Sequence, residues 1–328
     1  MSDSDKKNVL VWGHIHHAGP DLLKGRDDVS LEIVEDVTAD IGDRLATLDG
    51  IIVRTQRIDA AVLERAPRLA VVARHGVGFD AVDVPALSQR GIPLTTVGEA
   101  NAHTVAEHAL FLMLTLAKQG LTYDAATRGD DWKLRETFSC TELWRKTVLV
   151  IGFGRIGSRV SRLCRAFGMD VLVIDPYVPA FRIESEGHRR IEDMAAALGR
   201  ADYVTIHIPL NEETRHLVGA AELGAMKSSA FLINTARGPV VDEVALHRAL
   251  KSGAIKAAGL DVFDTEPPAA DNPLFKLDNV VLSPHIAGIT SECGARMSLV
   301  CAQNVLDAFD GRLKPDHVVN QDVLRRNR

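Results

Sequence analysis

Short apolar runs rich in Val, Ile and Leu alternate with stretches of helical spacing along the first part of the chain. The predicted strands are Val9–Trp12, Leu31–Val34, Ile51–Val53, Ala70–Val72 and Pro93–Val97. Between the third and fourth of these, Asp59–Ala66 is rich in helix formers and precedes Pro67, which stops a helix. Strands separated by helices predict a parallel sheet with crossover connections.

The pattern then changes to that of one long helix, Ala102–Ala117. Its apolar residues cover most of the helix circumference, which predicts burial on nearly all sides. The polar stretch that follows, about Lys118–Lys146, carries Trp132 and Trp144 and is predicted to be irregular. Because a loop of this length is uncommon inside a compact domain, we expect it either to wrap over the surface or to dock on a second subunit.

A second series of strands and helices begins at Thr147. Its predicted strands are Thr147–Gly152, Val171–Ile174, Tyr203–Ile208, Ala230–Thr235, Ala257–Val262 and Val280–Ser283, six in all. The predicted helices between them include Ile156–Phe167, capped by Gly168, as well as Ile191–Leu198 and Glu243–Lys251. This alternation predicts an α/β, Rossmann-type doubly wound sheet, and a last helix, about Ser291–Asp310, leads to the C-terminus.

The composition is that of a globular protein and argues against nucleic-acid-binding, membrane-binding and secreted proteins. The 328 residues suffice for about two domains, and 46% apolar with 25% charged residues is ordinary for a globular protein. The net charge of −6 and the lack of a long basic tract argue against nucleic acid or an anionic membrane as the main partner. The polar first residues lack the apolar core of a signal peptide.

The cysteines and the long helix favour a cytoplasmic protein without a membrane span. The four cysteines form no CxxC pair, so we expect reduced thiols in a cytoplasmic protein rather than disulfides or a metal site; they are Cys140, Cys164, Cys293 and Cys301. The predicted helix Ala102–Ala117 carries Glu107 and His108, which favours a buried helix over a membrane span.

Three glycines form a GxGxxG pattern between a predicted strand and a predicted helix. Gly152 permits the tight turn, Gly154 lets a pyrophosphate approach the backbone, and Gly157 lets the helix pack closely on the strand. The N–H groups of Arg155 and Ile156 are expected to face the phosphates at the helix N-terminus. The context therefore favours a dinucleotide site over a simple glycine turn.

An acid lies where such a site needs one. Asp175 follows Gly157 by about 18 residues, close to the spacing of the carboxylate that binds the adenosine ribose. That carboxylate accepts hydrogen bonds from the ribose hydroxyls and repels a 2′-phosphate. Pro176 and Tyr177 follow, so no basic residue stands directly after the acid. The sequence therefore predicts NAD, with NADH preferred over NADPH.

Three chemically active residues follow predicted strands in the second series. Arg237 can bind a carboxylate with two parallel hydrogen bonds, Glu266 is a carboxylate, and His285 is a titratable base. Taken singly, each has a structural alternative: a surface ion pair, a turn residue before a proline, and a hydrogen-bonded histidine. Because ligands bind beyond the carboxyl ends of strands in open α/β sheets, all three together favour an active site.

The motifs resemble those of the D-isomer-specific 2-hydroxyacid dehydrogenase family, and within it the D-3-phosphoglycerate dehydrogenase-like branch. The matching segments span most of the chain in order: Arg74–Asp83, Asn101–His108, Gly152–Gly157, His207–Leu210, Asn234–Gly238, Gly259–Pro267 and Ser283–Gly288. The resemblance implies an NAD-dependent oxidoreductase. His285 is similar to the family's acid/base, Glu266 to its carboxylate partner, and Arg237 to the residue that binds the substrate carboxylate.

The resemblance also implies binding residues. Those matching the family's nicotinamide-side and hinge contacts to NAD are Thr104, Ile208, Pro209, Thr235, Ala236, Asp261 and Gly288. Those matching its substrate contacts, besides Arg237 and His285, are Arg54, Val77, Gly78 and Asn101. It further implies a discontinuous flavodoxin-like substrate domain of about residues 1–100 and 290–328, and an NAD-binding domain of about 101–289. The active site is expected in the cleft between them.

The resemblance leaves the assembly, the substrate and one loop open. The family is typically a homodimer through residues around 102–146, where Trp132 is expected either as an anchor or as a core residue. The substrate candidates are 3-phosphoglycerate, glycerate or hydroxypyruvate, glyoxylate, D-lactate, and sulfonated or branched 2-hydroxy acids. His14, His16 and His17 follow the first strand, and a substrate-reading loop or a polar surface is favoured there over a metal site.

Two alternatives to a 2-hydroxyacid dehydrogenase remain. The family includes a transcriptional corepressor that keeps the fold, the NAD site and the three catalytic residues but works by binding protein motifs, and formate dehydrogenase shares the sheet. The chain ends soon after its last predicted helix, so we expect neither the corepressor's disordered C-terminal extension nor the C-terminal regulatory domains of many phosphoglycerate dehydrogenases. Feedback inhibition by serine is accordingly not expected.

Overall fold

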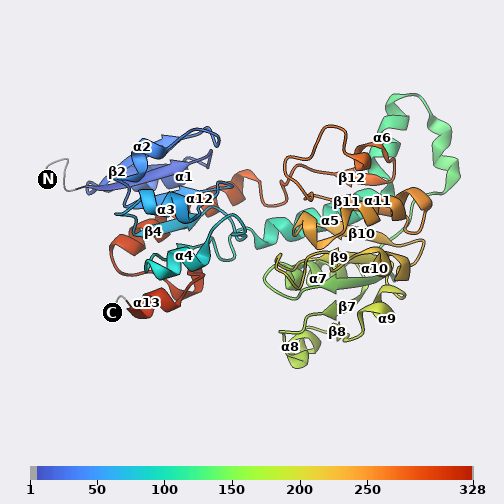
Figure 1. Cartoon of the computed structure of the whole chain (residues 1–328). Coiled ribbons are helices and arrows are strands. Elements are labelled where there is room, and N and C mark those ends of the chain that lie inside the picture. Colours follow the sequence, from blue (N-terminus) through green and yellow to red (C-terminus); the bar gives the residue numbers. More distant parts are fainter. Residues whose placement is uncertain (1–5, 327–328) are drawn as a thin grey trace. The chain divides into compact units, whose positions relative to one another are not determined.

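The computed structural model describes residues 6–326, and the chain divides into two compact units. Unit 1 comprises Met1–Asn101 and Ile289–Arg328, and unit 2 comprises Ala102–Gly288 (Figure 1). Each unit has its own parallel β-sheet. The α/β class predicted from the sequence is therefore confirmed. No helix in the described part of the chain is long and apolar enough to cross a membrane.

Unit 1 is a flavodoxin-like unit. Its five-stranded sheet has the order β2-β1-β3-β4-β5 and consists of β1 (Lys7–Trp12), β2 (Val29–Val34), β3 (Gly50–Val53), β4 (Val71–Arg74) and β5 (Leu94–Thr95). This is the strand order of flavodoxin-type doubly wound sheets. The helices of its first segment are α1 (Ala18–Lys24), α2 (Gly42–Leu45), α3 (Ala60–Arg65) and α4 (Val84–Gln89).

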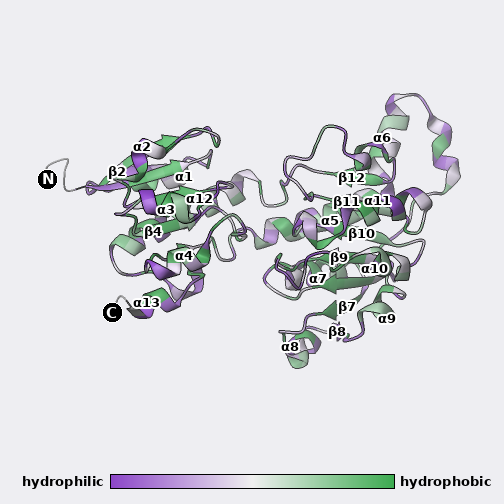
Figure 2. Cartoon of the chain, in the orientation of Figure 1, coloured by the Kyte–Doolittle hydropathy of each residue, from purple (hydrophilic) through white to green (hydrophobic). Residues whose placement is uncertain are grey.

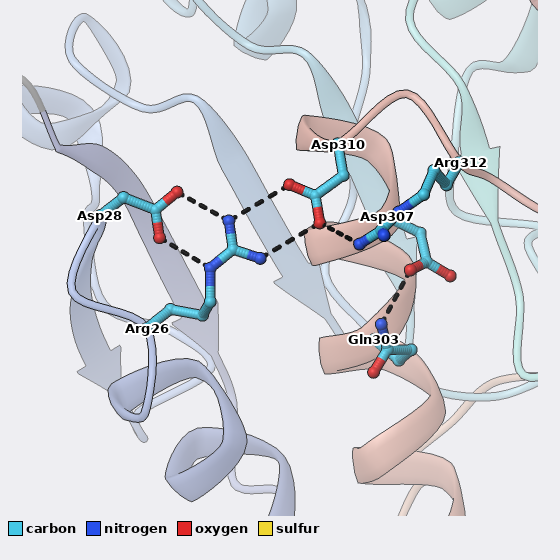
Figure 3. Close-up of polar contacts among 6 residues, drawn as sticks. All are labelled: Arg26, Asp28, Gln303, Asp307, Asp310 and Arg312. Carbon is cyan, nitrogen blue, oxygen red and sulfur yellow. Dashed lines mark hydrogen bonds and ion pairs between the residues drawn. The ribbon is translucent and has the colours of Figure 1, made fainter.

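The C-terminal segment completes unit 1. It contributes α12 (Ser291–Phe309), the short 3-10 helix Pro315–His317 and α13 (Asp322–Arg326). The helix α12 packs on α1 and on the strands β3 and β4, so residues from both ends of the sequence share one core. At the C-terminal end of α12, Arg26 binds Asp28 and Asp310 through paired hydrogen bonds of 2.7–3.2 Å (Figure 3). This ion-pair network fixes the end of α12 to the segment between α1 and β2.

Unit 2 is a Rossmann-type unit. Its seven-stranded parallel sheet has the order β12-β11-β10-β9-β6-β7-β8. The strands are β6 (Thr147–Ile151), β7 (Asp170–Ile174), β8 (Arg189–Arg190), β9 (Tyr203–Ile206), β10 (Phe231–Asn234), β11 (Ala257–Leu260) and β12 (Val280–Leu282). Its α-helices are α5 (Ala102–Lys118), α6 (Gly120–Arg128), α7 (Gly157–Ala166), α8 (Ala180–Ser185), α9 (Met194–Leu198), α10 (Ala220–Ala225) and α11 (Glu243–Ser252). Three 3-10 helices complete the unit: η2 (Trp132–Thr137), η3 (Gly238–Val240) and η4 (Pro273–Lys276).

The strands are buried on both faces, as expected for parallel sheets covered by helices. The burial pattern of β3, β9, β10 and β11 is buried at every position. Figure 2 shows the strands of both sheets as predominantly hydrophobic. The predicted long helix becomes α5, which packs against α7 and against β10 and β11. Its buried residues cover most of its circumference, whereas Phe111 remains exposed.

Two of the predicted features of unit 2 were wrong. The sheet of unit 2 has seven strands rather than six, because the two-residue strand β8 pairs with β7 beyond the predicted edge. The stretch 118–146 is not simply irregular, because it forms α6 and η2. Neither α6 nor η2 has a buried residue, so the apolar periodicity on which helix prediction depends is absent from them. Several predicted strands are also shorter at their ends, such as β5.

Candidate active site

Arg237, Glu266 and His285 follow three strands that are neighbours in the sheet of unit 2. Arg237 follows β10, Glu266 follows β11 and His285 follows β12, and the sheet order places these strands side by side. Because all three strands are parallel, their carboxyl ends lie at one edge of the sheet. The structure therefore brings the predicted cation, carboxylate and imidazole to the same edge, where open α/β sheets bind ligands.

His285 and Glu266 form a close hydrogen-bonded pair. His285 Nδ1 lies 2.6 Å from Glu266 Oε2, and both side chains are partly accessible. An ionised carboxylate only accepts hydrogen bonds, so the proton between them belongs to His285 Nδ1. The other ring nitrogen, Nε2, is then the one that can exchange a proton with a substrate. This is the arrangement of an oriented general acid/base.

The surroundings keep Glu266 ionised. Burial alone raises the pKa of a carboxyl group, but the hydrogen bond and the charge of His285 oppose this effect. The backbone N–H of Phe263, which donates to Glu266 Oε1 at 3.1 Å, and the charge of Arg237 act in the same direction. The net result is a pKa of Glu266 below its ordinary value. Glu266 therefore supplies a negative charge to His285 at neutral pH.

Arg237 is held by the turn that follows β10. The buried side chain of Asn234 accepts from the N–H of Ala236 at 3.0 Å and donates to the carbonyl oxygen of Arg237 at 2.9 Å. Arg237 Nη1 donates to the carbonyl oxygen of Ala236 at 2.6 Å. The turn thus holds the backbone of Arg237, and the Nη1 hydrogen bond holds its guanidinium. The positive charge of Arg237 acts on Glu266.

The glycine pattern forms the loop between β6 and α7. Gly152 has φ +94°, and a Cβ atom there would lie 2.6 Å from the carbonyl oxygen of His207. A Cβ atom on Gly157 would collide with the backbone of Gly152, so the close packing of helix and strand requires glycine. By contrast, no atom lies within 4 Å of the Cβ position of Gly154. The backbone of Gly154 is therefore open to the approach of another molecule.

Asp175 stands directly after β7 and binds the glycine loop. Its Oδ2 accepts from the N–H of Phe153 at 2.7 Å, and its Oδ1 accepts from the N–H groups of Tyr177 and Val178 at 2.9 and 3.1 Å. The two oxygens of a carboxylate offer about four acceptor positions. Acceptor capacity is thus left for a ribose hydroxyl. The hydroxyl of Tyr177 donates to Glu213 at 3.1 Å, which adds a second negative charge on this side.

These residues fit a dinucleotide. Gly154 leaves space for a pyrophosphate, and Arg155 and Ile156 precede the first turn of α7, where helical N–H groups have no partner within the helix. At the end of β10, the buried hydroxyl of Thr235 has no hydrogen-bond partner within the described chain. An unsatisfied buried hydroxyl at the ligand-binding edge of the sheet is consistent with a partner supplied by a ligand. Ala236 follows it in the same turn.

The other residues with predicted cofactor roles have varied environments. Ile208 and Pro209 follow β9, and Thr104 is buried in α5. Asp261 is completely buried after β11, with its carboxylate bound to the segment that carries His285 and that ends at Gly288. Sequence reasoning assigned Asp261 a cofactor contact and missed this internal role. It also missed His108 and Ser283, which contact Asp261 and for which the spacing gave no signal.

Unit 1 holds the predicted substrate contacts other than Arg237 and His285. Arg54 directly follows β3, and its Nη1 donates to the carbonyl oxygen of His14 at 3.4 Å. Val77 and Gly78 follow β4 and are half-buried. Asn101 is buried, and its Oδ1 has no hydrogen-bond partner within residues 6–326. These four residues stay predictions.

The histidines after β1 line a surface pocket of about 290 Å³ in unit 1. His14 Nδ1 lies 3.5 Å from Glu35, His17 Nδ1 lies 2.9 Å from Asp21, and the rings of His16 and His17 stack. In the described chain, no group of three or more His, Cys, Asp or Glu residues is arranged to hold a metal ion.

Trp132, in unit 2, is 63% exposed, so the alternative of a core tryptophan was wrong.

Comparisons with known proteins show the family of the chain. The family model described as "D-isomer specific 2-hydroxyacid dehydrogenase, NAD binding domain" matches residues 110–287. The D-3-phosphoglycerate dehydrogenase of Methanocaldococcus jannaschii is 37% identical over 315 residues, which cover 95% of this chain and 59% of that one. The glyoxylate reductase of Korarchaeum cryptofilum is 37% identical, with 98% of each chain covered.

A solved structure extends the similarity to three dimensions. The D-lactate dehydrogenase of Aquifex aeolicus, complexed with NAD and lactic acid, has a TM-score of 0.87 and 30% identity, and the match covers 96% of this chain and 99% of that one. The chain spans only 50–59% of the length of the phosphoglycerate dehydrogenases it matches. The family model covers more than half of the chain, and the full-length similarities point the same way. The chain belongs to the D-isomer-specific 2-hydroxyacid dehydrogenase family.

Proposed function

We propose that the protein is an NAD-dependent oxidoreductase that interconverts D-2-hydroxy acids and 2-oxo acids. The observation that carries the proposal is the 2.6 Å contact between His285 Nδ1 and Glu266 Oε2 beside Arg237. These are the groups that such a reaction needs: a proton donor and acceptor, a carboxylate that orients it, and a cation for the substrate carboxylate. The proposal also draws on the similarity to relatives named for this chemistry.

The roles of the side chains follow from their charges. Bound NADH supplies the hydride that adds to carbon 2 of the oxo acid. Arg237 binds the substrate carboxylate and draws electron density from the 2-oxo group. His285 gives a proton from Nε2 to the carbonyl oxygen, and Glu266, which accepts from Nδ1, orients the ring for this transfer. In the opposite direction, neutral His285 accepts the hydroxyl proton.

The substrate is sought with a panel of 2-oxo acids. The purified protein is tested for NADH oxidation with glyoxylate, hydroxypyruvate, pyruvate, phosphohydroxypyruvate, sulfopyruvate and branched analogues. We expect turnover of at least one of these 2-oxo acids, and we expect one of them to have a catalytic efficiency well above the rest. Tight NADH binding without turnover of any oxo acid would instead favour an NAD-dependent binding protein of the corepressor type.

We also propose that NADH is preferred over NADPH. Asp175 stands in the position of the ribose-binding acid, and Glu213 is joined to the same side by its hydrogen bond with Tyr177. A 2′-phosphate there meets two carboxylates and no adjacent basic residue in sequence. Equal catalytic efficiency with the two reduced cofactors contradicts this preference.

We also propose a homodimer through the α6–η2 arm, defined as residues 120–138. This arm extends from the end of α5 (Figure 1), and its residues Leu121 and Trp132 are 61% and 63% exposed. Phe138, its last residue, is 90% exposed. Large apolar side chains gathered on one arm are typical of a surface that is covered in an assembly.

Light scattering at known protein concentration tests the dimer. The double variant Trp132→Glu, Phe138→Glu is expected to shift the mass toward that of one chain. The variant Phe181→Glu is the matched control, because Phe181 is 73% exposed on α8, outside the arm. A monomeric wild-type protein, or an arm variant that keeps the mass of the dimer, refutes this part of the proposal.

A further inference from the structure

One buried acid, Asp261, binds three consecutive backbone N–H groups around His285. Its carbonyl oxygen accepts from the N–H of His285 at 2.8 Å. Its carboxylate oxygens accept from the N–H groups of Ile286 and Ala287 at 2.9 and 2.8 Å. Asp261 is 0% exposed, so these bonds are shielded from water. The N–H of His285 is shared with the carbonyl oxygen of Ser283 at 3.1 Å, whereas those of Ile286 and Ala287 bind Asp261. Asp261, directly after β11, is therefore the main support of the backbone that carries the proposed acid/base.

That backbone has a conformation that requires support. His285 has φ +53°, in the left-handed region that residues other than glycine rarely adopt. The hydrogen bonds to Asp261 fix this conformation, because each of the three N–H groups points toward the same residue. The direction of the imidazole, and with it the position of Nε2, follows from the backbone. A loss of order at Asp261 is thus expected to misplace His285 even when Glu266 is intact.

Ser283 and His108 hold the Asp261 carboxylate in turn. The hydroxyl of Ser283 lies 2.5 Å from Asp261 Oδ1, and His108 Nε2 lies 2.9 Å from Ser283 Oγ. The carboxylate only accepts, so the Ser283 proton points to Asp261, and the Ser283 oxygen must accept from His108. His108 therefore carries a proton on Nε2. The order of donation runs from His108 to Ser283 to Asp261, across α5, β12 and β11.

The neutral form of His108 suffices for this role. Burial lowers the pKa of His108, and the charge of Asp261, 3.5 Å from Nε2, opposes the shift without reversing it. His108 packs against the ring of Phe111 on the same helix, with 5.4 Å between the ring centroids. A neutral ring protonated on Nε2 donates one directed hydrogen bond without burying a second charge.

We propose that His108 and Ser283 are positioning residues for the acid/base, acting through Asp261 on the backbone of residues 285–287. The inference rests on the proposed function for its catalytic readout. Ser283 contacts His285 through the backbone alone, since its carbonyl oxygen accepts from the N–H of His285 at 3.1 Å. The side chains of His108 and Ser283 instead bind toward Asp261, so their effect is on the placement of the pair formed by His285 and Glu266. Loss of the His108 donor is expected to lower the rate of the chemical step more than the affinity for NADH.

An isosteric pair of variants tests the donor. In His108→Gln the side-chain amide can still donate to Ser283, whereas in His108→Met a group of similar size cannot. We expect kcat for 2-oxo acid reduction to fall about 10- to 100-fold in His108→Met, with KM for NADH little changed, because small displacements of reacting groups have effects of this size. His108→Gln is expected to keep most of the wild-type kcat. Ser283→Thr against Ser283→Ala gives the same comparison one step along the network.

Hydrogen exchange gives a readout that needs no turnover. The amides of residues 285–287 are expected to exchange faster in His108→Met than in His108→Gln and in the wild type. If the wild type reduces no 2-oxo acid but the exchange differs in this way, the proposed function fails and the positioning network stands. If His108→Met lowers only the melting temperature, with kcat and the exchange of these amides unchanged, the inference is overturned.

Discussion

His285 Nδ1 lies 2.6 Å from Glu266 Oε2, and this contact joins residues that follow two neighbouring strands, β12 and β11. It leaves Nε2 as the ring nitrogen available to a substrate. The pair gains its geometry from both strands, since the N–H of Phe263 binds Glu266 and Asp261 binds the backbone of His285. The geometry of the His285–Glu266 pair thus depends on the register of β11 and β12 rather than on a single loop.

Replacing Glu266 by Gln removes the negative charge and keeps the size of the side chain. Hydrogen bonds to charged groups contribute about 1.5–3 kcal/mol, so kcat for reduction is expected to fall about 10- to 100-fold. Steady-state kinetics at saturating NADH and 2-oxo acid measure kcat. An unchanged kcat in Glu266→Gln would separate Glu266 from the acid/base.

Replacing Arg237 by Lys keeps the charge but loses the planar fork that binds a carboxylate with two hydrogen bonds. We expect kcat/KM for the 2-oxo acid to fall about 10- to 100-fold, while the dissociation constant of NADH stays the same. Arg200→Lys is the control, because Arg200 is exposed after α9. Equal losses of oxo acid and NADH affinity in Arg237→Lys contradict a role specific to the substrate.

Replacing Asp175 by Ser removes the carboxylate that is expected to repel a 2′-phosphate. The ratio of catalytic efficiencies with NADPH and NADH is expected to rise at least about tenfold, which corresponds to about 1.4 kcal/mol. Glu213→Gln is expected to act in the same direction through the loss of the second charge. Glu192→Gln, at an exposed carboxylate away from Tyr177, serves as the control. A ratio that does not move in Asp175→Ser refutes the assignment.

Two buried histidines are expected to make stability depend on pH. Burial lowers the pKa of His75 to about 4 and that of His207 to about 3. The unfolded chain binds these protons below pH 6.5, whereas the folded chain does not until the pH falls to the lowered values. Lowering the pH from 6.5 therefore favours unfolding, by up to roughly 1.4 kcal/mol per pH unit for each histidine.

Chemical denaturation between pH 7 and pH 4 measures this dependence. His207→Gln is expected to flatten the slope of unfolding free energy against pH. His14→Gln is the control, because the His14 side chain is 74% exposed. A slope that His207→Gln leaves unchanged means that His207 takes up a proton in the folded protein as readily as in the unfolded one.

The sequence predicted the features that depend on local pattern. The glycine loop, the strand before it and the acid after β7 have fixed spacing, so Gly152, Gly157 and Asp175 could be placed without coordinates. The apolar runs of buried parallel strands located most of both sheets. Arg237, Glu266 and His285 could be proposed together because the carboxyl ends of parallel strands share an edge.

Other features depend on contacts between segments far apart in the sequence. His108, Ser283 and Asp261 come from three elements, and nothing in the spacing of each indicates the other two. The exposed helix α6 lacks apolar periodicity, and β8 is an edge strand of two residues, Arg189–Arg190, which takes its structure from pairing with β7. Local sequence pattern gives no prediction where a segment takes its structure from contacts with distant segments.

The role of His285 as acid/base is tested by the rate of NADH oxidation by wild type and His285→Gln, with the best 2-oxo acid of the panel at saturation. A general acid contributes about 10²- to 10⁴-fold, so we predict a loss in this range with NADH binding retained. Near-normal turnover in His285→Gln contradicts it, because the proton must then come from another group.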